Sequence, residues 1–139
     1  MKKIFPKVFS ALFLIFLFYS ACAGNKPQSS DEIAIHLKAG TFDPVRSELK
    51  LPSQLAKTSQ EKREYGYYLI QFFKPITDKE KELIKEFGGE IIHYIPDYSF
   101  LIKIPTKKVG ELKKNSLVRW IGDYLPGYKI SPKLLERKF

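Results

Sequence analysis

The sequence predicts an α+β fold: a ferredoxin-like (βαββαβ) two-layer sandwich, with a four-stranded antiparallel sheet and two helices on one face. Three observations predict it. Residues 65–130 hold four apolar segments of strand composition, and two charged amphipathic segments separate them in the order strand, helix, strand, strand, helix, strand. Pro96-Asp97 places turn chemistry between the two middle strands.

The first predicted strand spans residues 65–73, YGYYLIQFF, which are rich in aromatic and branched side chains. Alternation places Tyr68, Ile70 and Phe72 on one face, and Tyr67, Leu69, Gln71 and Phe73 on the other. Because both faces are apolar, we expect both to be covered.

A helix is predicted next, over ITDKEKELIKEFGG. Thr77 and Glu80 have the spacing of a capping box, and Leu83, Ile84 and Phe87 form one apolar side. Gly88 suits a left-handed C-terminal cap.

The remaining elements follow the same logic. Residues 90–95 and 98–104 form a hairpin, in which Tyr98, Phe100, Ile102 and Ile104 face the core. Val109 and Leu112 share one side of a second helix within TKKVGELKKNS, where Gly110 weakens the helical preference. Residues 117–125, LVRWIGDYL, form the last strand.

The N-terminus predicts export. Lysines precede an apolar run of about a dozen residues, which is shorter than the roughly 20 that span a bilayer, so residues 1–21 have the layout of a signal peptide. Tyr19-Ser20-Ala21-Cys22 resembles a bacterial lipobox, although Tyr19 stands where Leu is usual. We expect Cys22 to be lipidated, and the protein to be anchored to the bacterial cell envelope, facing outward from the outer or cytoplasmic membrane.

The rest of the chain divides by composition. Residues 22–31 form a polar tether, residues 32–64 an extended arm that allows a helical turn and is partly packed on the domain, residues 65–130 the compact domain and residues 131–139 a C-terminal tail. Both helices should cover one sheet face. The other face is open to a binding partner or a second copy of the chain, unless residues 32–57 fold across it.

Composition argues against several function classes. Removal of the three lysines in residues 1–21 lowers the formal net charge from +9 to +6, and the chain has no Arg-rich run, so we expect no nucleic-acid partner. His36, His93 and one cysteine make no credible zinc set, and His93 is read as a sheet residue rather than a general base. We therefore expect no cofactor, no metal and no enzymatic activity.

The order of several segments resembles the N-terminal propeptide region of bacterial subtilisin-type serine proteases. The segments are AGTFDP (39–44), the strand with Gln71 and Phe72, YIPDYSFLI (94–102) and VRWIGDYLPGYKISP (118–132). The likeness covers roughly residues 36–134. The chain carries none of the catalytic motifs of those proteases, and no catalytic domain follows within it.

The resemblance implies a sheet face that docks on a protease and a C-terminal segment that blocks its cleft. The docking face would use Tyr67, Leu69, Phe73, His93 or Tyr94, Leu101, and Trp120 or Ile121; of the paired choices we take Tyr94 and Ile121. The cleft-binding tail would begin at Tyr124, Leu125, Pro126, Gly127 and Tyr128, pairing as an added strand.

The sequence therefore favours a membrane-tethered, non-enzymatic module that binds and inhibits or chaperones a subtilisin-type serine protease. The alternative is a structural or protein-binding envelope lipoprotein that keeps the fold without a protease partner. A remnant of a longer protease gene is a further alternative.

Overall fold

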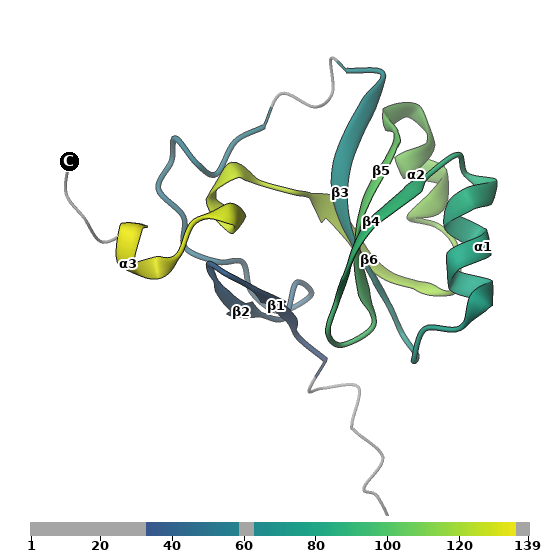
Figure 1. Cartoon of the computed structure of the whole chain (residues 1–139), viewed down its shortest axis with the longest axis horizontal. Coiled ribbons are helices and arrows are strands. Elements are labelled where there is room, and N and C mark those ends of the chain that lie inside the picture. Colours follow the sequence, from purple (N-terminus) through teal and green to yellow (C-terminus); the bar gives the residue numbers. More distant parts are fainter. Residues whose placement is uncertain (1–32, 59–62, 136–139) are drawn as a thin grey trace, which may run out of the picture.

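The computed structural model describes residues 33–58 and 63–135, and it confirms the α+β class (Figure 1). The predicted signal peptide, Cys22 and tether lie outside these residues, as does the end of the predicted tail. The strands are β1 Ile35–Leu37, β2 Gly40–Phe42, β3 Tyr65–Phe72, β4 Glu90–Ile95, β5 Ser99–Pro105 and β6 Val118–Asp123. The helices are α1 Asp78–Glu86, α2 Val109–Leu112 and α3 Pro132–Leu135, with 3-10 turns η3 Thr106–Lys108 and η4 Pro126–Lys129.

The larger sheet has the strand order β4-β5-β3-β6, and every neighbouring pair is antiparallel. Leu69 of β3 lies opposite Leu101 of β5 and Gly122 of β6, so β3 is central and pairs on both sides. Its buried residues confirm the prediction that both faces of this strand are covered.

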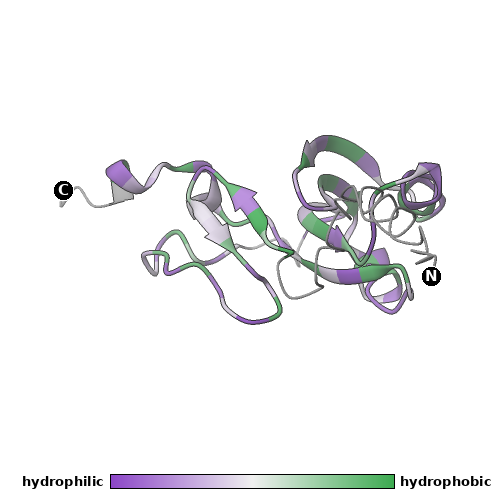
Figure 2. Ribbon diagram, turned by 90° about the horizontal axis from the view of Figure 1, so that it is seen from below, coloured by the Kyte–Doolittle hydropathy of each residue, from purple (hydrophilic) through white to green (hydrophobic). Residues whose placement is uncertain are grey.

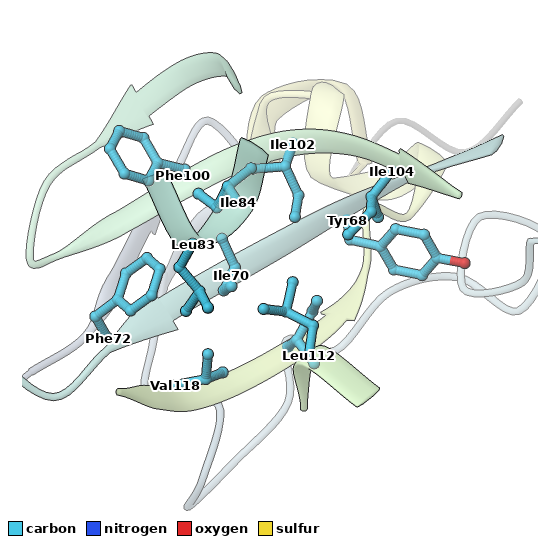
Figure 3. Close-up of a cluster of buried hydrophobic side chains, with 11 residues drawn as sticks. Tyr68, Ile70, Phe72, Leu83, Ile84, Phe100, Ile102, Ile104, Leu112 and Val118 are labelled. Atoms are coloured by element: carbon cyan, nitrogen blue, oxygen red, sulfur yellow. The ribbon is translucent and has the colours of Figure 1, made fainter. Parts of the chain in front are cut away.

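One face of the sheet packs against the helices (Figure 3). The buried residues of this helix-side core are Tyr68, Ile70, Phe72, Leu83, Ile84, Phe100, Ile102, Ile104, Leu112, Val118 and Ile121. The set includes Phe100, Ile102 and Ile104 of the predicted hairpin face, whereas Tyr98, predicted to share that face, is only partly buried and packs against the core. Burial of so many aliphatic and aromatic side chains is the main source of stability on this side.

Local sequence signals set the helix boundaries. Thr77 and Glu80 form the predicted capping box, in which the Glu80 carboxylate accepts from the Thr77 amide at 2.7 Å. Gly88 has the predicted left-handed backbone, with φ at 73°. The second helix is shorter than expected, since α2 is one turn preceded by a 3-10 turn.

The predicted turn at Pro96-Asp97 extends to Tyr98. Asp97 and Tyr98 both have positive φ, at 61° and 63°. This backbone region is unusual for a bulky residue such as tyrosine, so the surrounding contacts must hold it there.

The extended arm packs on the domain as expected, and it also contains two short paired strands that were not predicted. β1 and β2 pair as a small antiparallel hairpin, and the arm, residues 33–58, lies across the face of the larger sheet that the helices leave free. Figures 1 and 2 show the arm and the C-terminal segment on one side of the sheet and α1 on the other.

Candidate functional site on the arm-covered sheet face

A second core fills the space between the arm and the sheet. Its buried residues are Ile35 and Phe42 from the arm, Leu69, Ile95 and Leu101 from the sheet, and Tyr128 from the C-terminal segment. The side chains of Ile35 and Leu69 are fully enclosed. The face that sequence analysis left open to a partner, a second copy or the arm is thus covered by the arm.

An ion pair fastens the arm to β6. Arg119 Nη2 donates to Asp43 Oδ1 at 2.8 Å, and the two side chains are only 8% and 13% exposed. Arg119 Nη1 donates to Gln71 Oε1 at 2.6 Å, which brings in the central strand. A planar guanidinium can satisfy both partners at once, which a lysine could not.

The same network reaches the hairpin turn. Gln71 Nε2 donates to the carbonyl of Asp97 at 3.2 Å, and the Asp97 carboxylate lies 2.9 Å from His36 Nε2 in β1. His36 Nδ1 lies 3.0 Å from the Thr41 hydroxyl. Polar contacts therefore run without a break from the arm through the sheet and back to the arm.

The Asp43 carboxylate is held in its ionised form. Burial raises the pKa of Asp43, but the hydrogen bond from the Val45 amide and the Arg119 guanidinium outweigh it, and the net pKa lies below its ordinary value. Oδ2 of this carboxylate is buried without a hydrogen bond in the described structure, although Arg46 Nε lies 3.5 Å away. This site is built to hold the arm, since its charges point at each other and not at solvent.

The predicted cleft-binding tail is folded, which corrects the expectation of an extended strand. Pro126–Lys129 form the turn η4, and Gly127 and Tyr128 are buried. The Gly127 amide donates to the carbonyl of Leu55 in the arm at 3.1 Å, and the Tyr128 ring lies 5.6 Å from that of Phe42. A chain free to enter a protease cleft can begin only after this packed turn.

The predicted docking residues fall into three groups. Leu69 and Leu101 lie beneath the arm and are buried. Tyr67 lies at the rim of the same face and is 44% exposed, whereas Phe73 follows the end of β3 and is 52% exposed.

Tyr94 and Ile121 were assigned to the wrong face. Tyr94 pairs with Phe100 and packs against its ring at 5.8 Å, and Ile121 lies opposite Ile70; both partners belong to the helix-side core. Directly paired residues share a face of a sheet, so Tyr94 and Ile121 face the helices. By the same rule His93, opposite Leu101, lies on the arm side, where Trp120 also packs.

Described residues line two hollows on the arm side. A groove of about 340 Å³ is lined by His36, Lys38, His93, Tyr124, Lys129 and apolar neighbours. A hollow of about 240 Å³ is lined by Tyr67, Tyr124 and Pro126, with Lys57, Arg63 and Lys129 around them. Tyr124 and Lys129 separate the two.

The described residues contain neither a metal-binding cluster nor a membrane-spanning helix. In residues 33–58 and 63–135, no group of three or more His, Cys, Asp or Glu side chains could hold a metal ion. Within the same ranges no helix has the length and apolar character needed to cross a membrane.

Sequence reasoning missed the contacts of four residues in the network that joins the arm to the sheet, namely Asp43, Gln71, Asp97 and Arg119. Each lies inside one of the segments that carry the propeptide resemblance: AGTFDP, QFF, YIPDYSFLI and VRWIGDYLPGYKISP. The available signal was four polar residues embedded in apolar segments. A buried polar group needs a partner, so polar residues in otherwise apolar strands point toward one another.

Comparison with known proteins gives partial matches. A family described as "Domain of unknown function (DUF8729)" matches residues 36–125. Two proteins of Dictyostelium discoideum are similar to part of the chain: "Serine protease/ABC transporter B family protein tagB" is 31% identical over 85 residues, and the tagD protein of the same description is 30% identical over 78. These alignments cover 51% and 47% of this chain but 4% of each relative, and no solved structure matches.

Proposed function

The chain belongs to the family described as "Domain of unknown function (DUF8729)", and on this premise we propose that it is a propeptide-like module that binds a subtilisin-type serine protease and inhibits it or assists its folding. The observation that carries the proposal is the similarity of the chain to a segment of two proteins whose names include serine protease. The chain aligns with only 4% of the length of each relative, so a link between this chain and a protease is our proposal.

The topology supports the finer fold assignment. The proposed split βαβ, or ferredoxin-like, arrangement is supported by the element order β3, α1, β4, β5, α2, β6 and by the strand order β4-β5-β3-β6. The arm hairpin and η4 are additions that cover its second face.

The covered face moves the proposed docking surface to its rim. Tyr67, Tyr124 and Pro126 line the hollow of about 240 Å³ and are wholly or partly exposed. Tyrosines at a rim supply large contact area at low entropic cost, which favours a protein partner. Leu69 and Leu101, which are buried under the arm, would contribute indirectly by stabilising the packing that positions this rim.

The proposed inhibitory segment begins beyond η4. After Ile130 the chain leaves the fold through α3, where Leu134 is 48% exposed (Figure 1). This segment lies beside the Tyr124 rim in sequence. A protease that docks on the rim would therefore meet the departing chain, which could pair with an edge strand of its cleft.

The proposal is tested by inhibition. A chain beginning at Ala23, which keeps every residue that the structure describes, is titrated against a panel of subtilisin-type proteases while cleavage of a chromogenic peptide and the integrity of the added chain are followed. Tight inhibition with the chain intact is expected. Rapid digestion throughout, with no inhibition and no gain in protease refolding yield, would reject the proposal.

Two variants locate the contact. Tyr67→Ala should weaken inhibition at least tenfold, whereas Tyr94→Ala, an exposed tyrosine on the opposite face, should leave it unchanged. A chain that stops at Ile130 should bind the protease and fail to block its cleft. Equal loss from both tyrosine changes would show that the rim is not the docking surface.

The membrane tether is part of the proposal. Residues 1–21 and Cys22 have the sequence pattern of a lipidated, exported protein, which would place the module on the outer face of a bacterial membrane. Palmitate labelling of the expressed chain, lost in Cys22→Ser, is the expected result. Unchanged labelling in that variant would remove Cys22 as the anchor.

One observation favours the second candidate function, a structural or protein-binding envelope lipoprotein without a protease partner. The arm already buries the sheet face that would otherwise need a partner. A fold that covers its own apolar surface has no need of a protease for stability. Absence of inhibition together with a stably folded chain would favour this reading.

A further inference from the structure

The groove of about 340 Å³ is distinct from the hollow at the proposed protease-docking rim, and its lining residues suggest a separate function. It lies between the end of β1, the arm-side face of β4 and β5, and the C-terminal segment. Leu37, Ile95 and Leu101 supply its apolar part. Its walls come from segments far apart in sequence, so the groove exists only while the arm is packed on the sheet.

Its polar residues are all basic or neutral. Lys38, His93 and Lys129 line it, and no carboxylate does. Among the described residues Lys38 and His93 have no hydrogen-bonding or ionic partner, and Lys129 lies over the Tyr124 ring, with Nζ 5.3 Å from its centroid. Because no carboxylate lines the groove, this side of it presents positive charge.

His36 also lines the groove but is already engaged. Its two ring nitrogens face Thr41 at 3.0 Å and the Asp97 carboxylate at 2.9 Å. His36 therefore serves the arm network and presents only its ring to the groove. The Asp97 carboxylate is turned to His36, so it does not cancel the charge of the two lysines.

Two tyrosines complete the lining. Burial raises the pKa of Tyr124, and burial together with the nearby charges of Glu48 and Asp123 raises that of Tyr128. Both hydroxyls therefore stay protonated and can donate a hydrogen bond to an oxygen anion.

We propose that this groove binds the carboxylate of a small organic anion that carries an apolar group. The carboxylate would bind beside the basic residues Lys38, His93 and Lys129. The apolar group would pack against Leu37, Ile95 and Leu101. The volume of about 340 Å³ is at the lower end of the range for small-ligand sites, which suits a carboxylate with one apolar group. Two sources share this chemistry: a free carboxylic acid and the C-terminal residue of a peptide. The inference does not depend on a protease partner.

The test uses three probes on the ¹⁵N-labelled chain that begins at Ala23. N-acetylleucine supplies a carboxylate with an apolar group, N-acetylleucinamide is the same molecule without the charge, and an acetylated tripeptide ending in leucine represents a peptide terminus. N-acetylleucine should shift the amide signals of Leu37, His93 and Leu101 in a saturable way, with a dissociation constant on the order of 1 mM. The amide should not.

Lysine variants assign the contact. Lys38→Gln and Lys129→Gln should each weaken binding about two- to fivefold, the range of an exposed ion pair, and Lys113→Gln on the opposite side should not. Dispersed spectra verify folding of each variant. Tighter binding of the tripeptide would identify a peptide terminus as the source, and equal binding a free acid. Equal shifts from acid and amide, no shifts at all, or no effect of either groove lysine would overturn the proposal.

Discussion

Arg119 and Asp43, 76 positions apart in the sequence, meet with Nη2 2.8 Å from Oδ1 and join β6 to the arm. Both side chains are nearly enclosed. The contact decides what the second face of the sheet can do, because it holds the arm over Leu69 and Leu101.

Replacing Arg119 by methionine should lower the free energy of unfolding by about 3 kcal/mol. Methionine fills much of the space of the arginine stem but leaves the Asp43 carboxylate unpaired in a nearly buried site, and breaking one partner of such a pair costs roughly 3–5 kcal/mol. Urea unfolding measures the change.

The matched control is a double-mutant cycle. With Asp43→Asn in the same chain, the cost of Arg119→Met should fall to about half, because no unpaired charge is left behind. Additive losses would show that the two residues stabilise the fold through separate contacts, and not through their ion pair.

Acid should weaken the attachment of the arm. The pKa of Asp43 is depressed in the folded protein, so its contribution is present above the unfolded pKa and is lost as pH falls through the folded pKa. Asp43→Asn should therefore flatten the fall in stability below about pH 4. Urea midpoints at pH 7 and pH 3 measure this, and an unchanged slope would contradict it.

Glu80 offers an independent acid-sensitive site. Burial raises its pKa, but hydrogen bonds from the Thr77 hydroxyl and amide outweigh this and lower it overall. Because the pKa of Glu80, like that of Asp43, is lowered in the folded protein, the stabilisation by its carboxylate is lost in acid. Glu80→Gln should therefore lower the free energy of unfolding by about 1 kcal/mol at pH 7, the contribution of a helix cap, and by nearly nothing at pH 3. A pH-independent cost would mean that shape, not charge, makes the capping box effective.

Gly127→Ala should destabilise the protein by about 1–3 kcal/mol. An added Cβ would lie 2.8 Å from both terminal carbons of Leu51, so the Leu51 side chain or the arm that carries it must shift to make room. Gly110→Ala is the control: no atom lies within 4 Å of its Cβ position in α2, and the helix should gain about 0.5–1 kcal/mol. Thermal unfolding of Gly127→Ala and Gly110→Ala measures both effects. Similar changes in melting temperature for the two variants would contradict the prediction.

Leu69→Ala should cost about 2–5 kcal/mol, because Leu69 is fully buried between sheet and arm. Tyr67→Ala, two residues away on the same face, removes a side chain that is 44% exposed and should cost less than half as much. Chemical unfolding compares them. A small loss at Leu69 would mean that the arm is not packed in solution.

The predictable part of the fold rested on local signals. The capping box at Thr77, the left-handed Gly88 and the alternation through Phe100 and Ile104 act within a few residues, so sequence alone located α1 and the hairpin. The short α2 was overestimated, because Val109 and Leu112 fit one helical face whether the helix has one turn or three.

The sequence offered the arm as one of several possible covers for the open face and could not choose among them, because the contacts of the arm are long-range. Ile35 and Phe42 look like scattered apolar residues until Leu69 and Leu101 lie beneath them. The same limit applied to the site: nothing near Asp43 indicates Arg119, and the face of Tyr94 depends on its pairing with Phe100 across the hairpin. The prediction that tail residues such as Gly127 pair in a protease cleft failed for a similar reason, since their contacts are with Leu51 and Leu55 of the arm.

Limited proteolysis tests whether the arm stays on the sheet. Arg46 and Lys50 are exposed trypsin sites within the arm, and Lys133 is an exposed site in α3 beyond η4. If the arm is packed as described, cleavage at Lys133 should come first, while Arg46 and Lys50 are cut only as fast as sites in the larger sheet, because a protease needs several residues of extended backbone.

Arg119→Met should change that order. Loss of the ion pair raises the fraction of molecules with the arm detached, so cleavage at Arg46 and Lys50 should overtake cleavage in the sheet, as followed by mass spectrometry. Rapid cutting at Arg46 in the unchanged chain would have a wider consequence. The arm would then leave the sheet readily, and Leu69 and Leu101 would become available for docking after all.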